Sequence, residues 1–179
     1  MDLAVVSATI PEARRLTFCT GLAWALEPVL SLDTSPIGRR AASEVKQLVA
    51  ETWQVVGTDD DARDLELRVR DRDELVGVDL DVPESWRSDL LNVLQFGLRC
   101  ARTRDERWLV SALAACQDLL YFLQQAAGES GNEAGEWVID SVADWARADV
   151  WLSDYSTALS GVRSRIEDLA SAASVSRSP

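Results

Sequence analysis

Four carboxylates in the C-terminal third of the chain recur at helical spacing. Glu133, Glu136, Asp140 and Asp144 follow one another every three or four residues, so they would share one face of a helix. Carboxylates on paired helices can hold the Mg²⁺ ion of a nucleotide hydrolase. The sequence offers no second acidic helix at matching spacing, and charge runs are usual on exposed helices. We therefore interpret these acids as a solvated surface, with a Mg²⁺-dependent, all-helical nucleotide hydrolase as the alternative.

Tryptophans are interleaved with aspartates in the same segment. The rings of Trp137, Trp145 and Trp151 cannot all point to one side of a helix. A tryptophan that is exposed and ringed by acid has the composition of a protein-binding hot spot. We predict a partner-binding surface made by Trp137, Asp144, Asp149, Trp151, Asp154 and Tyr155. The alternative is that these rings pack against the N-terminal helix.

Composition excludes several classes of chemistry. The chain contains no histidine, which removes Ser-His-Asp and Cys-His catalysis and two-histidine zinc sites. Neither a phosphate-binding loop nor a dinucleotide glycine motif is present, so we predict no cofactor. A net charge of −12 argues against nucleic-acid and membrane partners and favours either solubility alone or a basic protein partner. The leading interpretation is a non-enzymatic binding module, such as an immunity-like protein that neutralises a basic toxin.

The cysteines and the N-terminus indicate a compartment. Cys19, Cys100 and Cys116 are odd in number and lie within apolar helical patterns, which is typical of buried free thiols. The first residues do not resemble a signal peptide, and no apolar run is long enough to span a membrane. We expect a cytoplasmic protein, and the sequence is compatible with homo-oligomers.

The element expected to organise the fold is an antiparallel helix hairpin. Residues 90–101 and 109–127 are both apolar over a wide arc, so each must pack against several other helices. Thr103 and Glu106 have the spacing of a capping box, and so short a turn makes the two helices antiparallel. In the second helix only a few polar residues are left to meet water: Ser111, Gln117, Asp118, Gln124 and Gln125.

The remaining segments predict further helices around this hairpin. A helix that starts at Pro11 should kink or end at Pro28, and another should start at Pro36 behind Ser35 and stop at Gly57. Helical and alternating periods compete over residues 64–82, where we favour a helix followed by extended chain over a hairpin.

The C-terminal part of the chain keeps one apolar register from residue 138 to residue 169. That is long for one globular helix, so it should either project or break near Ser153 or Gly161. The chain is thus predicted to be all-α, with a single helical domain over residues 1–170 and a disordered serine-rich tail over residues 171–179.

Several stretches resemble the YjaG-like domain-of-unknown-function family of small bacterial helical proteins. They are LTFCTGLAWALEPVL, VKQLVAETWQVV, ELVGVDLDVPESW and DYSTALSGVRSRIEDLA, and together they cover most of the chain. The resemblance implies a helical fold and carries no assigned activity. The chain departs from the family pattern over residues 58–75, where its alternation is strand-like.

Overall fold

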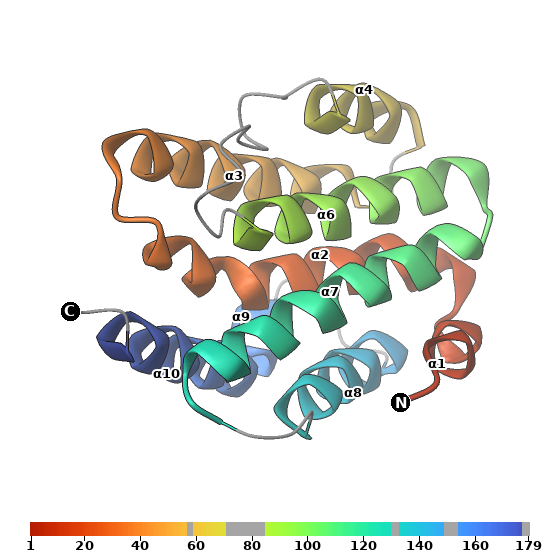
Figure 1. Cartoon of the computed structure of the whole chain (residues 1–179). Coiled ribbons are helices and arrows are strands. Elements are labelled where there is room, and N and C mark those ends of the chain that lie inside the picture. Colours follow the sequence, from red (N-terminus) through yellow and green to blue (C-terminus); the bar gives the residue numbers. More distant parts are fainter. Residues whose placement is uncertain (57–58, 71–84, 130–132, 149–153, 177–179) are drawn as a thin grey trace.

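The computed structural model of the chain describes residues 1–56, 59–70, 85–129, 133–148 and 154–176. Within these ranges every regular element is a helix and there is no strand, which confirms the predicted all-α class. The helices pack as one bundle around a shared hydrophobic core (Figure 1). None of the helices in these ranges combines the length and the apolar character that crossing a membrane requires.

Helix α2 (Arg15–Leu26) is the most enclosed element of the bundle. All of its residues except Arg15 and Trp24 are buried, so it has no polar face. Figure 1 shows it running between the α3 and α6 side of the molecule and the α8 and α10 side. At Gly97, on α6, an added Cβ would lie only 2.5 Å from the Cβ of Cys19. This close approach lets α2 and α6 cross almost backbone to backbone.

The segment predicted as one helix from Pro11 to Pro28 contains α2 and parts of two 3₁₀ turns, and a further helix precedes it. This helix, α1 (Leu3–Thr9), is capped by Asp2, whose carboxylate accepts from the backbone N–H of Ala4 at 3.0 Å. Short 3₁₀ turns flank α2 on both sides: η1 (Glu12–Arg14) and η2 (Glu27–Leu32). The chain leaves the α-helical form at Leu26, two residues before Pro28, as the proline predicts.

The predicted central hairpin is present as α6 (Ser85–Thr103) and α7 (Arg107–Ala126). The two helices are antiparallel and adjacent, and both pack on α2 (Figure 1). Leu113 and Leu120 of α7 are completely buried. The wide apolar arcs therefore point inward, as expected for core helices.

The predicted capping box at the hairpin turn is wrong. Thr103 is the last residue of α6; its hydroxyl donates to the carbonyl of Arg99 at 2.8 Å and accepts from the N–H of Asp105 at 3.3 Å, and the N-cap position of α7 is Glu106, not Thr103. The Glu106 carboxylate instead accepts from the hydroxyl of Ser7 at 2.8 Å and from the guanidinium of Arg15 at 3.1 Å. Tertiary contacts to α1 and α2 have replaced the local motif.

Helices α3 and α4 cover the other side of the hairpin. Helix α3 (Pro36–Val55) begins as predicted, with the Ser35 hydroxyl accepting from the N–H of Gly38 at 2.9 Å. Helix α4 (Asp59–Arg70) lies over α3 and α6 (Figure 1). The first part of the predicted 64–82 segment is therefore helical to residue 70, and its remainder lies outside the described residues.

The C-terminal register breaks into α8 (Glu133–Arg147), α9 (Tyr155–Ala158) and α10 (Ser160–Ser176). The break before Gly161 confirms one of the two predicted positions, and Ser153 lies outside the described residues. The predicted tail began too early, because α10 continues to Ser176. Its Ala173 is fully buried against the core, so this turn is held by packing that its small side chains do not reveal in the sequence.

The three cysteines are free and buried, as the sequence indicates. Burial raises the pKa of the Cys19, Cys100 and Cys116 thiols. Each is held in its neutral form, which is the unreactive form of a thiol.

Candidate functional site

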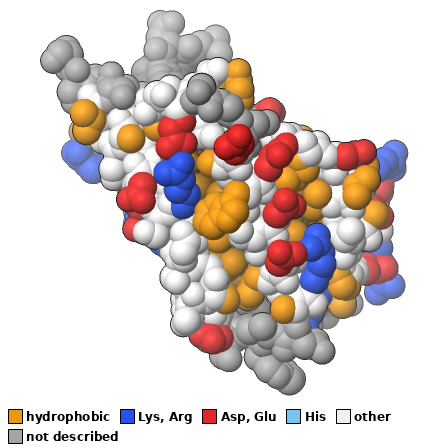
Figure 2. Space-filling view, turned by 90° about the horizontal axis from the view of Figure 1, so that it is seen from below, with side chains coloured by type: hydrophobic (Ala, Val, Ile, Leu, Met, Phe, Trp, Pro, Cys, Tyr) orange, Lys and Arg blue, Asp and Glu red, His pale blue; other side chains and the backbone are white. Residues whose placement is uncertain are grey.

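The predicted partner-binding residues have different surroundings. Of the tryptophans that the structure describes, only Trp137 on α8 is exposed, at 46%. Asp144 of the same helix and Asp154 before α9 are also exposed. Asp149 and Trp151 lie outside the described residues. Figure 2 looks onto the face that carries α8 and α10, where hydrophobic side chains lie among acidic and basic ones.

Tyr155 is engaged inside the protein. Its ring stacks on Trp53 with 3.9 Å between ring centroids and meets Trp24 edge-on at 5.4 Å. These contacts join α9 to α3 and α2, so the ring has a structural role. The predicted surface therefore depends, among its described aromatic residues, on Trp137.

The acidic residues of α8 are partly neutralised by neighbouring cations. The Glu136 carboxylate accepts from the N-terminal ammonium at 2.6 Å, a contact that raises the pKa of that ammonium. Asp144 pairs with Arg147 at 2.6 Å. Glu133 and Asp140 are exposed. In the described part of the chain no group of three or more histidine, cysteine, aspartate or glutamate side chains is arranged to hold a metal ion.

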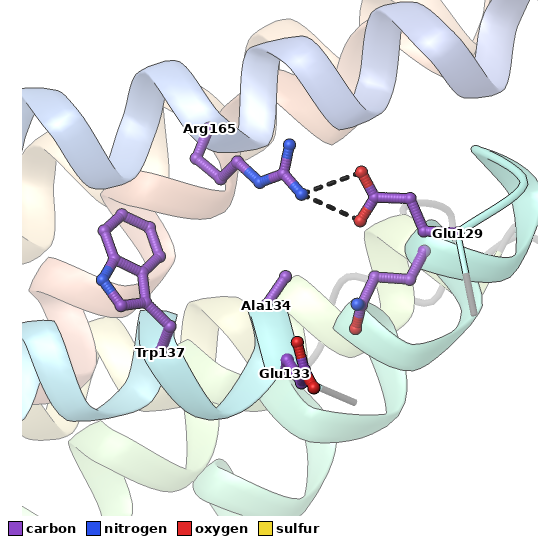
Figure 3. Close-up of a pocket in the computed structure, with 6 residues that line it drawn as sticks. Glu129, Glu133, Ala134, Trp137 and Arg165 are labelled. Carbon is purple, nitrogen blue, oxygen red and sulfur yellow. Dashed lines mark hydrogen bonds and ion pairs between the residues drawn. The ribbon is translucent and has the colours of Figure 1, made fainter. Parts of the chain in front are cut away.

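A pocket of about 340 Å³ lies beside Trp137, where the end of α7 meets α8 and α10. In Figure 3 Trp137 and Glu129 stand at opposite ends of this space, with Ala134 between them and Arg165 across from it. Six residues line it: Gln124, Glu129, Glu133, Ala134, Trp137 and Arg165. The pocket thus joins an exposed aromatic ring to carboxylate, amide and guanidinium groups.

The end of α7 places Glu129 in this pocket. Gly128 has a φ of 80°, in the left-handed region that glycine adopts without strain. The N–H of Gly128 donates to the carbonyl of Gln125 at 3.1 Å, and the N–H of Glu129 donates to that of Gln124 at 2.9 Å, as in a Schellman motif. The Glu129 carboxylate then accepts from Arg165 Nη2 through both oxygens, each at 2.8 Å.

Gln124 differs from its prediction as a solvent-facing residue. It is only 3% exposed, and its Oε1 has no hydrogen-bond partner among the described residues. A buried acceptor left unpaired costs roughly 1–3 kcal/mol relative to a paired one. No local pattern around Gln124 predicts this burial, because α10, which helps to enclose the pocket, lies more than 30 residues further along the chain.

A second unusual group is Asp89 of α6. Burial, together with the nearby charge of Asp118, raises the pKa of this carboxyl to about 6. It does not line the pocket beside Trp137.

This shift predicts a pH dependence of stability. The folded protein holds the Asp89 proton more tightly than the unfolded chain, so Asp89 should stabilise the fold progressively as the pH falls from about 7 to about 4. An NMR titration of the carboxyl carbons should place the Asp89 midpoint near 6. In Asp89→Asn this contribution to the slope of unfolding free energy against pH should vanish, and a slope identical to that of the wild type would contradict the prediction.

Comparisons with known protein families, curated proteins and solved structures found no match to this chain. The YjaG-like resemblance accordingly stays a prediction.

Proposed function

We propose that this protein is a non-enzymatic binding module that recognises a basic protein partner through Trp137 and the acidic residues around it. The specific form of the proposal is an immunity-like role, in which the partner is a basic toxin that is neutralised by binding. The observation that carries it is the 46% exposure of Trp137 on a helix where Glu133, Asp140 and Asp144 are exposed as well. A large aromatic ring left in water on a folded protein is a typical anchor of a protein interface.

The surroundings of Trp137 support a basic partner. Glu133 precedes it by four residues and Asp140 follows it by three, so both share its exposed side of α8. The whole chain carries a net charge of −12. The electric field of this charge accelerates the encounter with a positively charged protein. The Trp137 ring, once it is buried in the interface, slows dissociation of the complex.

Trp137→Ala is expected to weaken partner binding at least about 30-fold, which corresponds to roughly 2 kcal/mol. The partner would be captured from a lysate of the source organism at low salt, identified and purified, and its Kd measured for both proteins. Because Trp137 is exposed, the variant should fold normally, which circular dichroism can check. Tyr121→Ala is a matched control, since this tyrosine of α7 is 43% exposed and lies outside the pocket.

Association and dissociation rates, measured with the same purified partner, test the role of the acidic residues. Asp140→Asn should slow association and reduce its dependence on salt, with little change in the dissociation rate. Asp64→Asn on α4 is the control, because it removes an equal charge from a different part of the surface. A captured protein that is acidic, or one whose Kd is unchanged in Trp137→Ala, would overturn the proposal.

A further inference from the structure

We infer that α4 detaches from the bundle while the other helices stay folded, and that the buried carboxylate of Glu66 holds it in the closed form. This conformational change does not depend on the proposed function. Figure 1 shows α4 at one edge of the molecule and α8, the helix of Trp137, at the opposite edge.

Helix α4 contributes few side chains to the core. Among its described side chains the buried ones are those of Ala62, Leu65, Glu66 and Val69, so one is an alanine and one is charged. Helix α7, by comparison, buries nine residues, and eight of them are hydrophobic. A helix as short as α4 is marginal by itself, so its stability in a protein comes mainly from the apolar surface that it buries. Releasing α4 therefore removes much less stabilisation than unfolding the α6–α7 hairpin would.

The other helices remain connected to one another when α4 is open. Helix α4 packs on α3 and α6, and these two helices also contact each other directly. Both of them pack on α2 as well, and α6 pairs with α7. On the outer side of α4, Arg63 and Asp64 are exposed to water. Opening of α4 therefore breaks contacts on one side of α3 and α6 and leaves the contacts among the remaining helices in place.

Glu66 joins α4 to α6 through charge. It is only 4% exposed, and its Oε2 accepts from Nε of Arg102 at 2.6 Å. Nε of Arg99 lies 3.8 Å from the other oxygen of this carboxylate. The side chains of Arg99 and Arg102 are 38% and 39% exposed, so water can hydrate their charges after α4 leaves. The pair thus stabilises the closed form, because a buried carboxylate needs a cation beside it, and the open form leaves no charge buried.

A second ion pair, between α4 and α3, is weaker. Nη2 of Arg68 lies 2.7 Å from Oε2 of Glu51, but half of the Arg68 side chain is exposed. Exposed pairs contribute little to stability, since water and salt screen them. Glu66 is therefore the charged residue of α4 that we expect to control its opening.

Opening of α4 changes the surface of α6. It separates Arg99 and Arg102 from Glu66 and exposes the part of the core that Leu65 and Val69 cover. The guanidinium carbon of Arg99 also lies 3.9 Å from the ring centroid of Trp108. The open form therefore presents two guanidinium groups, one of them over an aromatic ring, on a chain whose net charge is −12.

Native-state hydrogen exchange of the whole protein, followed by mass spectrometry, tests this opening. Amides of α4 should exchange at least about 100-fold faster than the slowest amides of α7, because local opening requires less free energy than global unfolding. Low concentrations of urea should accelerate exchange strongly in α7 and weakly in α4, since the local opening exposes little surface. One shared rate with one shared urea dependence would show that α4 leaves only when the whole protein unfolds, and would overturn the inference.

Leu113→Ala distinguishes local opening from global unfolding. Leu113 of α7 is completely buried and stays packed when α4 is open, so this variant destabilises the closed and the open forms equally. It should accelerate exchange in α7 at least about 30-fold and leave the exchange rate of α4 unchanged. Equal acceleration of both helices would contradict a separate opening of α4.

Glu66→Gln tests the role of the ion pair. It keeps the size of the side chain but removes its charge, so exchange in α4 should become about tenfold faster. Asp64→Asn is the matched control, because Asp64 is an exposed acid of the same helix, and it should change this rate by less than about twofold. An α4 exchange rate that is unchanged in Glu66→Gln would show that Glu66 does not hold the helix closed.

Discussion

Leu113→Ala is expected to lower the free energy of unfolding by about 2–5 kcal/mol. Leu113 lies in the middle of α7, is completely buried and belongs to the core shared by the whole bundle. The substitution removes apolar contacts and leaves a cavity that the neighbouring helices can fill only in part. Chemical denaturation followed by circular dichroism measures the effect, and the slope of the transition should remain that of the wild type.

Val175→Ala is the matched control for this change. It removes methyl groups from an aliphatic side chain that is 73% exposed near the end of α10, so its effect should stay within about 0.5 kcal/mol. A loss of less than about 0.5 kcal/mol in Leu113→Ala would show that α7 does not contribute the centre of the core.

Local patterns in the sequence predicted the parts of the fold that local interactions determine. Helix α3 has a polar outer face, a serine cap and a proline in its first turn, and all three signals appear within its own residues. The α6–α7 hairpin follows from two broad apolar arcs separated by a short turn. In these elements the period of the side chains, the cap and the final packing agree with one another.

Other features could not be predicted because distant residues determine them. Helix α2 is buried on all sides, so its apolar residues do not single out one face. The sequence therefore does not indicate which side of this helix packs against which neighbour. Glu106 has the spacing of a capping residue but binds Ser7 and Arg15, from nearly a hundred residues away. The pocket beside Trp137 likewise needs Arg165, which is 36 residues from its partner Glu129.

The exposure of Trp137 agrees with one part of the predicted partner-binding surface, whose role in binding stays a prediction. Its place among acids on a helix suggested an exposed anchor, and its exposure agrees with that suggestion. Tyr155 follows an aspartate in the same way, yet it is stacked on Trp53. Composition alone does not distinguish the two cases, since the difference comes from which helix lies opposite each ring.

A buried ion pair gives the second large expected effect. Arg163 of α10 donates to the Glu27 carboxylate at 3.1 Å and to the carbonyl of Trp24 at 2.8 Å, and it also lies over the Trp24 ring. The Glu27 side chain is only 11% exposed. Burial raises the pKa of the Glu27 carboxyl, and Arg163 partly offsets that rise.

Arg163→Met keeps much of the side-chain volume but removes the charge and the donors. Glu27 then remains buried without its cation, and removing one member of a buried pair destabilises a protein by about 3–5 kcal/mol. Because a quarter of the Arg163 side chain is exposed, we expect a loss at the lower end of that range near neutral pH. Thermal and chemical denaturation of the variant and the wild type give the difference directly.

The pH dependence of the stability of Arg163→Met distinguishes the effect of the lost Arg163 charge from the effect of its lost packing. Without Arg163 the pKa of Glu27 should rise further, so the folded variant binds this proton more tightly than the unfolded chain does. The difference in stability between variant and wild type should therefore shrink as the pH falls from neutral toward 4.5, the ordinary pKa of a glutamate carboxyl, because Glu27 takes up its proton at a higher pH in the folded variant than in the folded wild type. Adding Glu27→Gln to Arg163→Met should recover much of the loss at neutral pH and remove this dependence. A loss that is equal at both pH values and unaffected by Glu27→Gln would assign the effect to packing against Trp24 instead of to the buried charge.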